Sequence, residues 1–172
     1  PDLLLTGQWM TLTVLKNSGG KFSLVKPGVD AHTGWWNSIT GADIDNDGDT
    51  DYIVGNFGEN SFLQASEEYP VRVFAKDFDN NSSYDALFSS FLPSAPHGKK
   101  EEFPVASRDL MIEQITRMRV KYPDYKSYSE ATMDDVLVPA DREDALQLHA
   151  SNFRTGYFEN KGGFSFVFHP LT

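Results

Sequence analysis

The stretch "DIDNDGDTD", residues 43–51, places five carboxylates within nine residues. Acids at this density repel one another unless a cation or full solvation relieves the repulsion. The aspartates alternate, so their side chains can converge in a tight loop, and Gly48 supplies the backbone freedom that a sharp turn requires. The spacing therefore predicts a loop that binds a metal cation, with a solvated acidic turn as the alternative.

The spacing of the acids also indicates which metal the loop binds. Counted from Asp43, the acids Asp43, Asp45, Asp47 and Asp51 occupy positions 1, 3, 5 and 9, and the backbone carbonyl of Asp49 occupies position 7. An all-oxygen shell of this size suits Ca²⁺, whereas Mg²⁺ prefers few carboxylates and keeps its waters. We therefore expect these five residues to be calcium ligands.

An EF-hand shares the opening of this motif but needs a Glu at position 12 and a helix on each side. Position 12 is Val54. The flanking segments "WNSITGAD" and "DYIVGNF" are short, rich in Ile, Val and aromatic residues, and interrupted by Gly, which is typical of strands. The sequence thus predicts a calcium-binding β-hairpin rather than an EF-hand.

A second loop repeats the first 34 residues later (77 − 43 = 34). Its corresponding residues are Asp77, Asp79, Asn81, Ser83 (through its carbonyl) and Asp85. Ser82 stands where the first loop has Gly48, and Asn81 replaces an acid, so we expect a weaker second calcium site. A hairpin turn that has lost the ion is the alternative, because Asn and Ser form turns unaided.

Two further segments, "TVLKNSGGKFSLVKP" and "GYFENKGGFSFVFHP", each read as strand, Asn-x-Gly-Gly turn and strand. Acidic hairpins alternating with Gly-Gly hairpins would form consecutive antiparallel four-stranded units, as in the blades of a β-propeller. The expected fold is mainly β with a helical insertion. We expect blade repeats with two acidic loops over residues 1–95, the insertion over residues 96–150, and the closing hairpin of the last blade over residues 151–172.

The insertion contains three expected helices. In "SRDLMIEQITRMRVKYP", residues 107–123, apolar residues recur at helical spacing, Ser107 can cap the helix and Pro123 ends it. A second helix is expected across residues 129–137 and a third across residues 141–150. We interpret the apolar stripe of the first helix as packing against the sheet.

Composition excludes several classes of function. The formal net charge of −10, with no basic cluster, disfavours nucleic acid and anionic membranes as partners. The chain of 172 residues has no cysteine, so it has neither disulfides nor thiolate chemistry, and nothing in it resembles a transmembrane segment. The first residues contain no initiating Met and no signal sequence, which suggests a fragment.

No catalytic motif is present in the sequence, and the four histidines, His32, His97, His149 and His169, are isolated. We therefore expect no enzyme activity. The adjacent Trp35 and Trp36 are candidate ligand-binding residues, because exposed aromatics stack on sugars or anchor protein partners. Packing between neighbouring blades is the interpretation we favour for both.

The acidic loop followed by "DYIVGN" resembles the FG-GAP or VCBS repeat, the calcium-binding blade also found in integrin α-subunits. Together, "GQWMTLTVLKNSGGKF", "GWWNSITGADIDNDGDTDYIVGNFGEN" and "PVRVFAKDFDNNSSYDALFSSF" resemble the repeats of bacterial cell-envelope proteins that often carry an ASPIC/UnbV domain. The stretch over residues 103–132 resembles an insertion in Bacteroidetes members of that group. The resemblance implies a β-propeller fold, structural calcium at the ten loop residues given above, and secretion or surface exposure.

Two functions remain open at this stage. The first is a non-catalytic, calcium-stabilised surface module that binds a protein or a carbohydrate. The second is the substrate-docking part of a larger secreted enzyme that acts on polysaccharides. Extracellular calcium modules bind with affinities of about 10⁻⁴ to 10⁻³ M, so such a loop is filled outside the cell, at the surface or in the periplasm. The chain holds too few blades to close a ring, and its open blade edges could pair with a second copy.

Overall fold

The computed structural model describes residues 1–94 and 98–171, and the chain divides into two compact units. The first unit combines Pro1–Glu68 with His149–Thr172, and the second is Tyr69–Leu148. The second unit is therefore inserted into the chain of the first. His97 lies outside the described residues.

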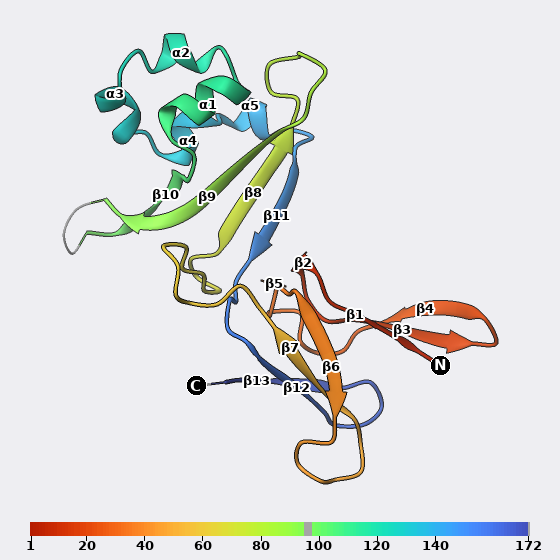
Figure 1. Cartoon of the computed structure of the whole chain (residues 1–172). Coiled ribbons are helices and arrows are strands. Elements are labelled where there is room, and N and C mark those ends of the chain that lie inside the picture. The colour runs from red at the N-terminus through yellow and green to blue at the C-terminus, as the bar shows by residue number, and fades with distance from the viewer. Residues whose placement is uncertain (95–97, 172) are drawn as a thin grey trace. The chain divides into compact units, whose positions relative to one another are not determined.

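The first unit consists of strands arranged in three sheets (Figure 1). The three-stranded sheet contains β1 (Leu3–Leu5), β3 (Thr13–Ser18) and β4 (Lys21–Val25). The two-stranded sheet contains β2 (Gln8–Met10) and β5 (Gly34–Trp35). The four-stranded sheet contains β6 (Ser38–Ala42), β7 (Asp51–Gly55), β12 (Gly156–Asn160) and β13 (Phe166–Pro170).

The four-stranded sheet joins two segments that lie far apart in the sequence. Strands β6 and β7 form the hairpin that carries the first acidic loop, and β12 pairs antiparallel with both β7 and β13. The spatial order β6–β7–β12–β13 follows the chain order, as in an antiparallel meander. The last hairpin thus completes the sheet that the first acidic hairpin begins.

Both Gly-Gly hairpins are confirmed. Between β3 and β4 the turn contains Gly19 and Gly20, with φ of +63° and +90°. Between β12 and β13 the turn contains Gly162 and Gly163, with φ of +76° and +61°. In each turn the Asn side chain accepts a hydrogen bond from a turn amide. Left-handed backbone at these positions explains the use of glycine.

The core of the first unit gathers side chains from several strands and the segments that join them. It consists of Leu12, Val14, Val29, Trp36, Val54, Phe158 and Phe166. Val54 and Phe158 come from neighbouring strands of the four-stranded sheet, and both are 0% exposed. Burial of these apolar groups is the main stabilising contribution to the unit.

The second unit combines a four-stranded sheet of order β10–β9–β8–β11 with five short helices. The strands are β8 (Val71–Lys76), β9 (Asp85–Pro93), β10 (Lys100–Pro104) and β11 (Leu146–Ala150), of which the last two residues are counted with the first unit. The helices are α1 (Arg108–Gln114), α2 (Met118–Lys121), α3 (Tyr125–Ser129), α4 (Met133–Val136) and α5 (Pro139–Arg142). Among the described residues, no helix has the length and apolarity needed to span a bilayer.

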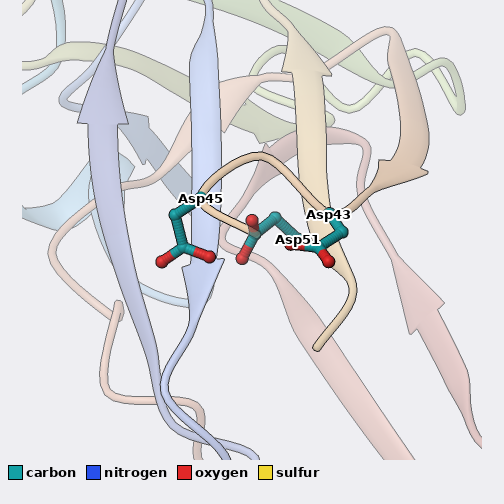
Figure 2. A group of neighbouring side chains, drawn as sticks. All are labelled: Asp43, Asp45 and Asp51. Atoms are coloured by element: carbon teal, nitrogen blue, oxygen red, sulfur yellow. The ribbon is translucent and has the colours of Figure 1, made fainter. Parts of the chain in front are cut away.

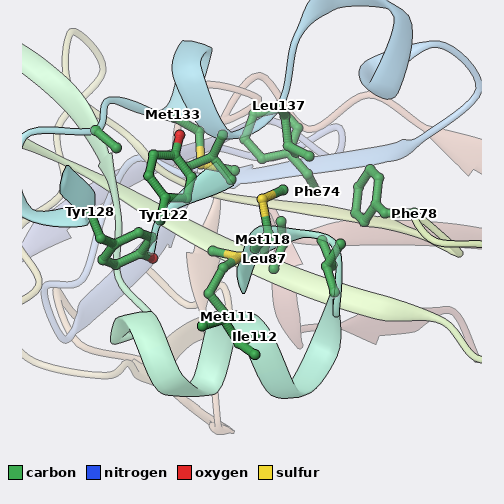
Figure 3. Close-up of a cluster of buried hydrophobic side chains, with 13 residues drawn as sticks. Phe74, Phe78, Leu87, Met111, Ile112, Met118, Tyr122, Tyr128, Met133 and Leu137 are labelled. Atoms are coloured by element: carbon green, nitrogen blue, oxygen red, sulfur yellow. The ribbon is translucent and has the colours of Figure 1, made fainter. Parts of the chain in front are cut away.

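One apolar cluster holds the helices of the second unit to its sheet (Figure 3). Phe74 and Leu87 enter it from β8 and β9, and three methionines of the helical segment pack around them: Met111, Met118 and Met133. Flexible thioether side chains fill the irregular space between short helices and a sheet. The expected apolar stripe is therefore used for packing.

The helices differ from the expected ones at three points. The predicted helix over residues 107–123 begins as expected at its cap Ser107, but it breaks at Ile115, where φ is −127° and ψ is 93°. Ile115 is 0% exposed, so burying its side chain takes precedence over continuing the helix. The second predicted helix, over residues 129–137, is limited to α4, because α3 ends at Ser129 and the chain starts a new helix at the cap Thr132. The third predicted helix, over residues 141–150, is mostly strand β11, whose sequence "LQLHA" alternates apolar and polar residues as a strand does.

The division of the chain also differs from the expected one. We expected both acidic loops in one segment, residues 1–95, followed by a helical insertion over residues 96–150. Instead the second acidic hairpin, β8–β9, belongs to the same unit as the helices. The insertion thus begins at Tyr69, because the strands of the second hairpin supply the sheet against which the helices pack.

Candidate metal centre

The first acidic loop brings three carboxylates together at one end of the β6–β7 hairpin. Oxygen atoms of Asp43, Asp45 and Asp51 lie within 4.8 Å of one another (Figure 2). Ca²⁺ holds its oxygen ligands at about 2.3–2.6 Å, so two ligands on opposite sides of the ion are separated by roughly 5 Å. The spacing of these three carboxylates therefore fits a single calcium ion.

The loop backbone is shaped by two residues with left-handed conformation, Asn46 at φ +61° and Gly48 at φ +93°. The amide of Gly48 donates to Asp43 Oδ2 at 3.2 Å. Each of the next carboxylates also receives an amide two residues further along, Asp45 from Asp47 at 3.2 Å and Asp47 from Asp49 at 2.8 Å. These bonds tie the three carboxylates to the loop backbone without a metal.

Asp51 is the buried member of the group, with 1% of its surface exposed. Its Oδ2 accepts the amide of Ile44 at 2.9 Å, and its Oδ1 accepts the amide of Asn160 at 2.8 Å. One bond closes the loop, and the other ties the loop to β12. Asp51 is therefore both a candidate ligand and the anchor of the loop in the sheet.

The other two predicted ligands are placed differently. Asp47 is exposed, and it does not belong to the group of three carboxylates. Asp49 was expected to contribute only its carbonyl oxygen, and its carboxylate lies near Gly162. The structure therefore assembles three of the predicted side chains of this loop and leaves the ligand roles of Asp47 and Asp49 as predictions.

The second loop has the same internal geometry as the first. Its left-handed residues, Asn80 and Ser82, follow Asn46 and Gly48 by 34 positions, with φ of +60° and +70°. The amides of Phe78, Ser82 and Ser83 donate to Asp85, Asp77 and Asn81, which repeats the bonds of the first loop. Carboxylate oxygens of Asp77, Asp79 and Asp85 again lie within 4.8 Å of one another. The substitutions at two positions have not changed the shape of the loop.

The two carboxylate oxygens of Asp79 in the second loop have different surroundings. Asp79 Oδ2 lies 3.4 Å from the amide of Thr116, in the segment between α1 and α2. Asp79 Oδ1 is buried and has no hydrogen-bond partner among the described residues. A buried carboxylate oxygen without a partner is costly, and a cation between Asp77, Asp79 and Asp85 would remove that cost.

The electrostatics of both loops favour a bound cation. Burial raises the pKa of Asp85, and the neighbouring carboxylates of Asp79 and Asp77 raise it further, against the amide of Phe78. Desolvation likewise raises the pKa of Asp45, with contributions from the neighbouring carboxylates of Asp47, Glu159 and Asp51. A bound divalent cation would reverse these shifts by favouring the charged forms. The donor set is all oxygen, which fits Ca²⁺ and offers nothing to a metal that prefers sulfur or imidazole.

Three residues around the loops were missed in the sequence: Glu159 and Asn160 of β12, and Thr116. Each lies more than 30 residues from the loop that it contacts. Only the pairing of β12 with β7, and the break after α1, bring them there. The local spacing of acids carries no signal for such contacts.

The two candidate ligand-binding tryptophans are packed within the first unit. Trp36 is 2% exposed, and its Nε1 donates to the carbonyl of Met10 at 2.8 Å, so it is not available to stack on a ligand. Trp35 is half-buried, with its ring centroid 4.9 Å from those of Trp9, Phe57 and Phe153. The burial of Trp36 shows that its role is packing. Trp35 belongs to a cluster of aromatic side chains, and one member of that cluster, Phe57, is 41% exposed.

Replacing Ser82 with glycine is expected to stabilise the second loop. A non-glycine residue at φ +70° is strained, so Ser82→Gly should raise the free energy of unfolding of the second unit by about 0.5–1 kcal/mol. Calcium affinity at this loop should also rise. Chemical denaturation and calorimetry on the variant measure both effects. Ser83→Gly is the matched control, since Ser83 is not left-handed, and an equal gain in the control would contradict the strain argument.

Comparison with known proteins finds a family match for part of the chain. Residues 1–54 match the family model described as an FG-GAP-like repeat. The matched segment contains the whole first acidic loop and ends within β7. No curated protein and no solved structure gives a significant match to this chain.

Proposed function

We propose that this chain is a calcium-stabilised, propeller-type segment of a secreted or surface protein, and that it acts as a non-catalytic module for binding a protein or a carbohydrate. The observation that carries the proposal is the pair of acidic loops with the same geometry, each converging three carboxylates within 4.8 Å. Such convergence is costly for the protein alone and favourable once a divalent cation is bound.

The architecture of the first unit supports the propeller part of the proposal. A four-stranded antiparallel meander with an acidic loop between its first two strands matches the layout of a calcium-binding blade. The match of residues 1–54 to the FG-GAP-like repeat points the same way. The resemblance to repeats of bacterial envelope proteins with an ASPIC/UnbV domain, found in the sequence, is the finer form of this proposal.

The role that we assign to calcium is structural. The predicted shell, with the backbone carbonyl at position 7, surrounds the ion largely with protein oxygens, so we assign no coordination position to a substrate. Calcium would then fix the ends of the strands, and ligands would be bound by loops and by exposed aromatic side chains such as Phe57, which packs against Trp35. An extracellular or periplasmic location follows, because only there is calcium abundant enough to fill sites of about 10⁻⁴ to 10⁻³ M.

Calcium should raise the melting temperature of the protein, and magnesium should not. At ~10 mM, calcium would exceed such dissociation constants by about 10 to 100 times, which corresponds to about 1.4–2.7 kcal/mol of stabilisation per site. For a unit of this size that is a rise of roughly 5–15 °C. Thermal melting in chelator, in calcium and in magnesium measures the effect, with Asp45→Ala and Asp79→Ala identifying the loop responsible. Equal melting temperatures in chelator and in calcium would refute the proposal.

A further inference from the structure

We infer that residues 159–161, at the end of β12, contribute to calcium binding at the first loop. Glu159 and Lys161 set the affinity of the loop for the ion, and Asn160 couples ion binding to the C-terminal hairpin. The inference rests on the proposed function, because it concerns the site at Asp43, Asp45 and Asp51. It adds residues that follow the loop by more than 100 positions in the chain.

Asn160 contacts the loop through its backbone and its side chain. Its amide donates to Asp51 Oδ1 at 2.8 Å, and its Nδ2 donates to the carbonyl of Thr50 at 3.3 Å. Its Oδ1 accepts the amide of Gly162 at 3.0 Å, within the turn that joins β12 to β13. One residue thus links the buried carboxylate of the site to the turn of the last hairpin.

Glu159 adds a sixth acid beside the five of the loop. Its side chain is 13% exposed, and its carboxylate contributes, after desolvation and Asp47, to the raised pKa of Asp45. Lys161 Nζ contacts Glu159 Oε1, and His169 Nε2 lies 2.8 Å from Glu159 Oε2. The hydrogen bonds from Lys161 and then His169 lower the pKa of Glu159.

Lys161 places a positive charge in the field of the acidic loop. The pKa of Lys161 is raised, first by its hydrogen bond to Glu159 and also by the charges of Asp45 and Asp47. In the protein without calcium, Lys161 therefore relieves part of the repulsion among the acids. A calcium ion entering the loop meets an attractive charge at Glu159 and a repulsive one at Lys161.

Among the described residues, no ion pair corresponding to that of Glu159 and Lys161 lies beside the second loop on the side that another segment covers. There the contacts come from neutral side chains, Thr116 to Asp79 and Gln114 to the amide of Ala86. The two sites should therefore respond differently to the same changes in salt concentration. The second loop also provides a site within the same chain that substitutions in β12 should leave unchanged.

Calorimetric titration of calcium into the full chain tests the electrostatic part. The background is Asp77→Ala, which disables the second loop, so that only the first site is measured. Glu159→Gln should weaken calcium binding roughly three- to tenfold, and Lys161→Met should strengthen it roughly two- to fivefold. The matched controls Glu68→Gln and Lys21→Met, on exposed residues of the same unit, should change affinity less than either.

Hydrogen exchange tests the coupling. Because coupling is reciprocal, calcium should slow exchange of the Asn160 amide and of the β12–β13 hairpin by about tenfold or more, and Asn160→Ala should reduce the calcium affinity of the loop. Asp43→Ala should abolish the slowing. Two results would overturn the inference while calcium still binds. The first is that calcium leaves the exchange rates unchanged. The second is that Glu159→Gln and Lys161→Met leave the calcium affinity unchanged or shift it in the same direction. Absence of calcium binding to the Asp77→Ala background itself would instead refute the proposed function.

Discussion

Replacing Asp51 with alanine is expected to abolish calcium binding at the first loop and to lower the free energy of unfolding of the first unit by about 2–4 kcal/mol, even without calcium. The carboxylate is 1% exposed and accepts the amides of Ile44 and Asn160. Its removal leaves two donors without their acceptor and removes one of the hydrogen bonds between the loop and β12. Denaturant unfolding in chelator, followed by calcium titration, separates the two effects.

Asp49→Ala is the matched control for this prediction. Asp49 is exposed, and its expected ligand is the backbone carbonyl, which alanine retains. We expect it to change the free energy of unfolding by no more than about 0.5 kcal/mol and to leave calcium bound. If Asp51→Ala behaved like Asp49→Ala, Asp51 would be neither a ligand nor the anchor of the loop.

Phe74→Ala should destabilise the second unit by about 3–5 kcal/mol, which is most of the stability of a small unit. The ring is 2% exposed within the cluster that joins the helices to the sheet, and the guanidinium carbon of Arg142 lies 5.1 Å from its centroid (Figure 3). Its loss removes apolar contacts and leaves a cavity that short helices cannot fill without moving. Urea unfolding, followed by the circular dichroism of the helices, measures the change.

Val120→Ala provides the comparison in the same unit. Val120 lies on α2 and is 86% exposed, so its substitution should change the free energy of unfolding by less than about 0.5 kcal/mol. A similar loss in both variants would mean that the cluster around Phe74 does not hold the unit together.

The parts of the fold that depend on local residue chemistry could be predicted from the sequence. Glycine indicates positions with left-handed backbone conformation, and alternating aspartates indicate the acidic loops, since both features depend on only a few neighbouring residues. The two Gly-Gly hairpins and the flanking strands of both acidic loops were found in this way. Ser82 shows the limit of this approach, because it adopts the same backbone region as Gly48 without being glycine.

The pairing of distant strands could not be predicted in the same way. That β12 pairs with β7 depends on two segments about 100 residues apart, and the pattern of each segment fits many partners. The strand at Leu146–Ala150 was expected to be helical because short apolar segments are ambiguous between the two periods. Because this pairing could not be predicted, Glu159 and Asn160 were missed as well. Both residues contact or influence the loop only because β12 lies beside it.

The presence and location of calcium is the most direct test of the central claim. Anomalous diffraction from crystals of the full chain grown in millimolar calcium would locate the ions. We predict one peak among Asp43, Asp45 and Asp51 and a second, of equal or lower occupancy, among Asp77, Asp79 and Asp85. Ordered loops without a peak at either position would contradict the claim that these acids form calcium sites.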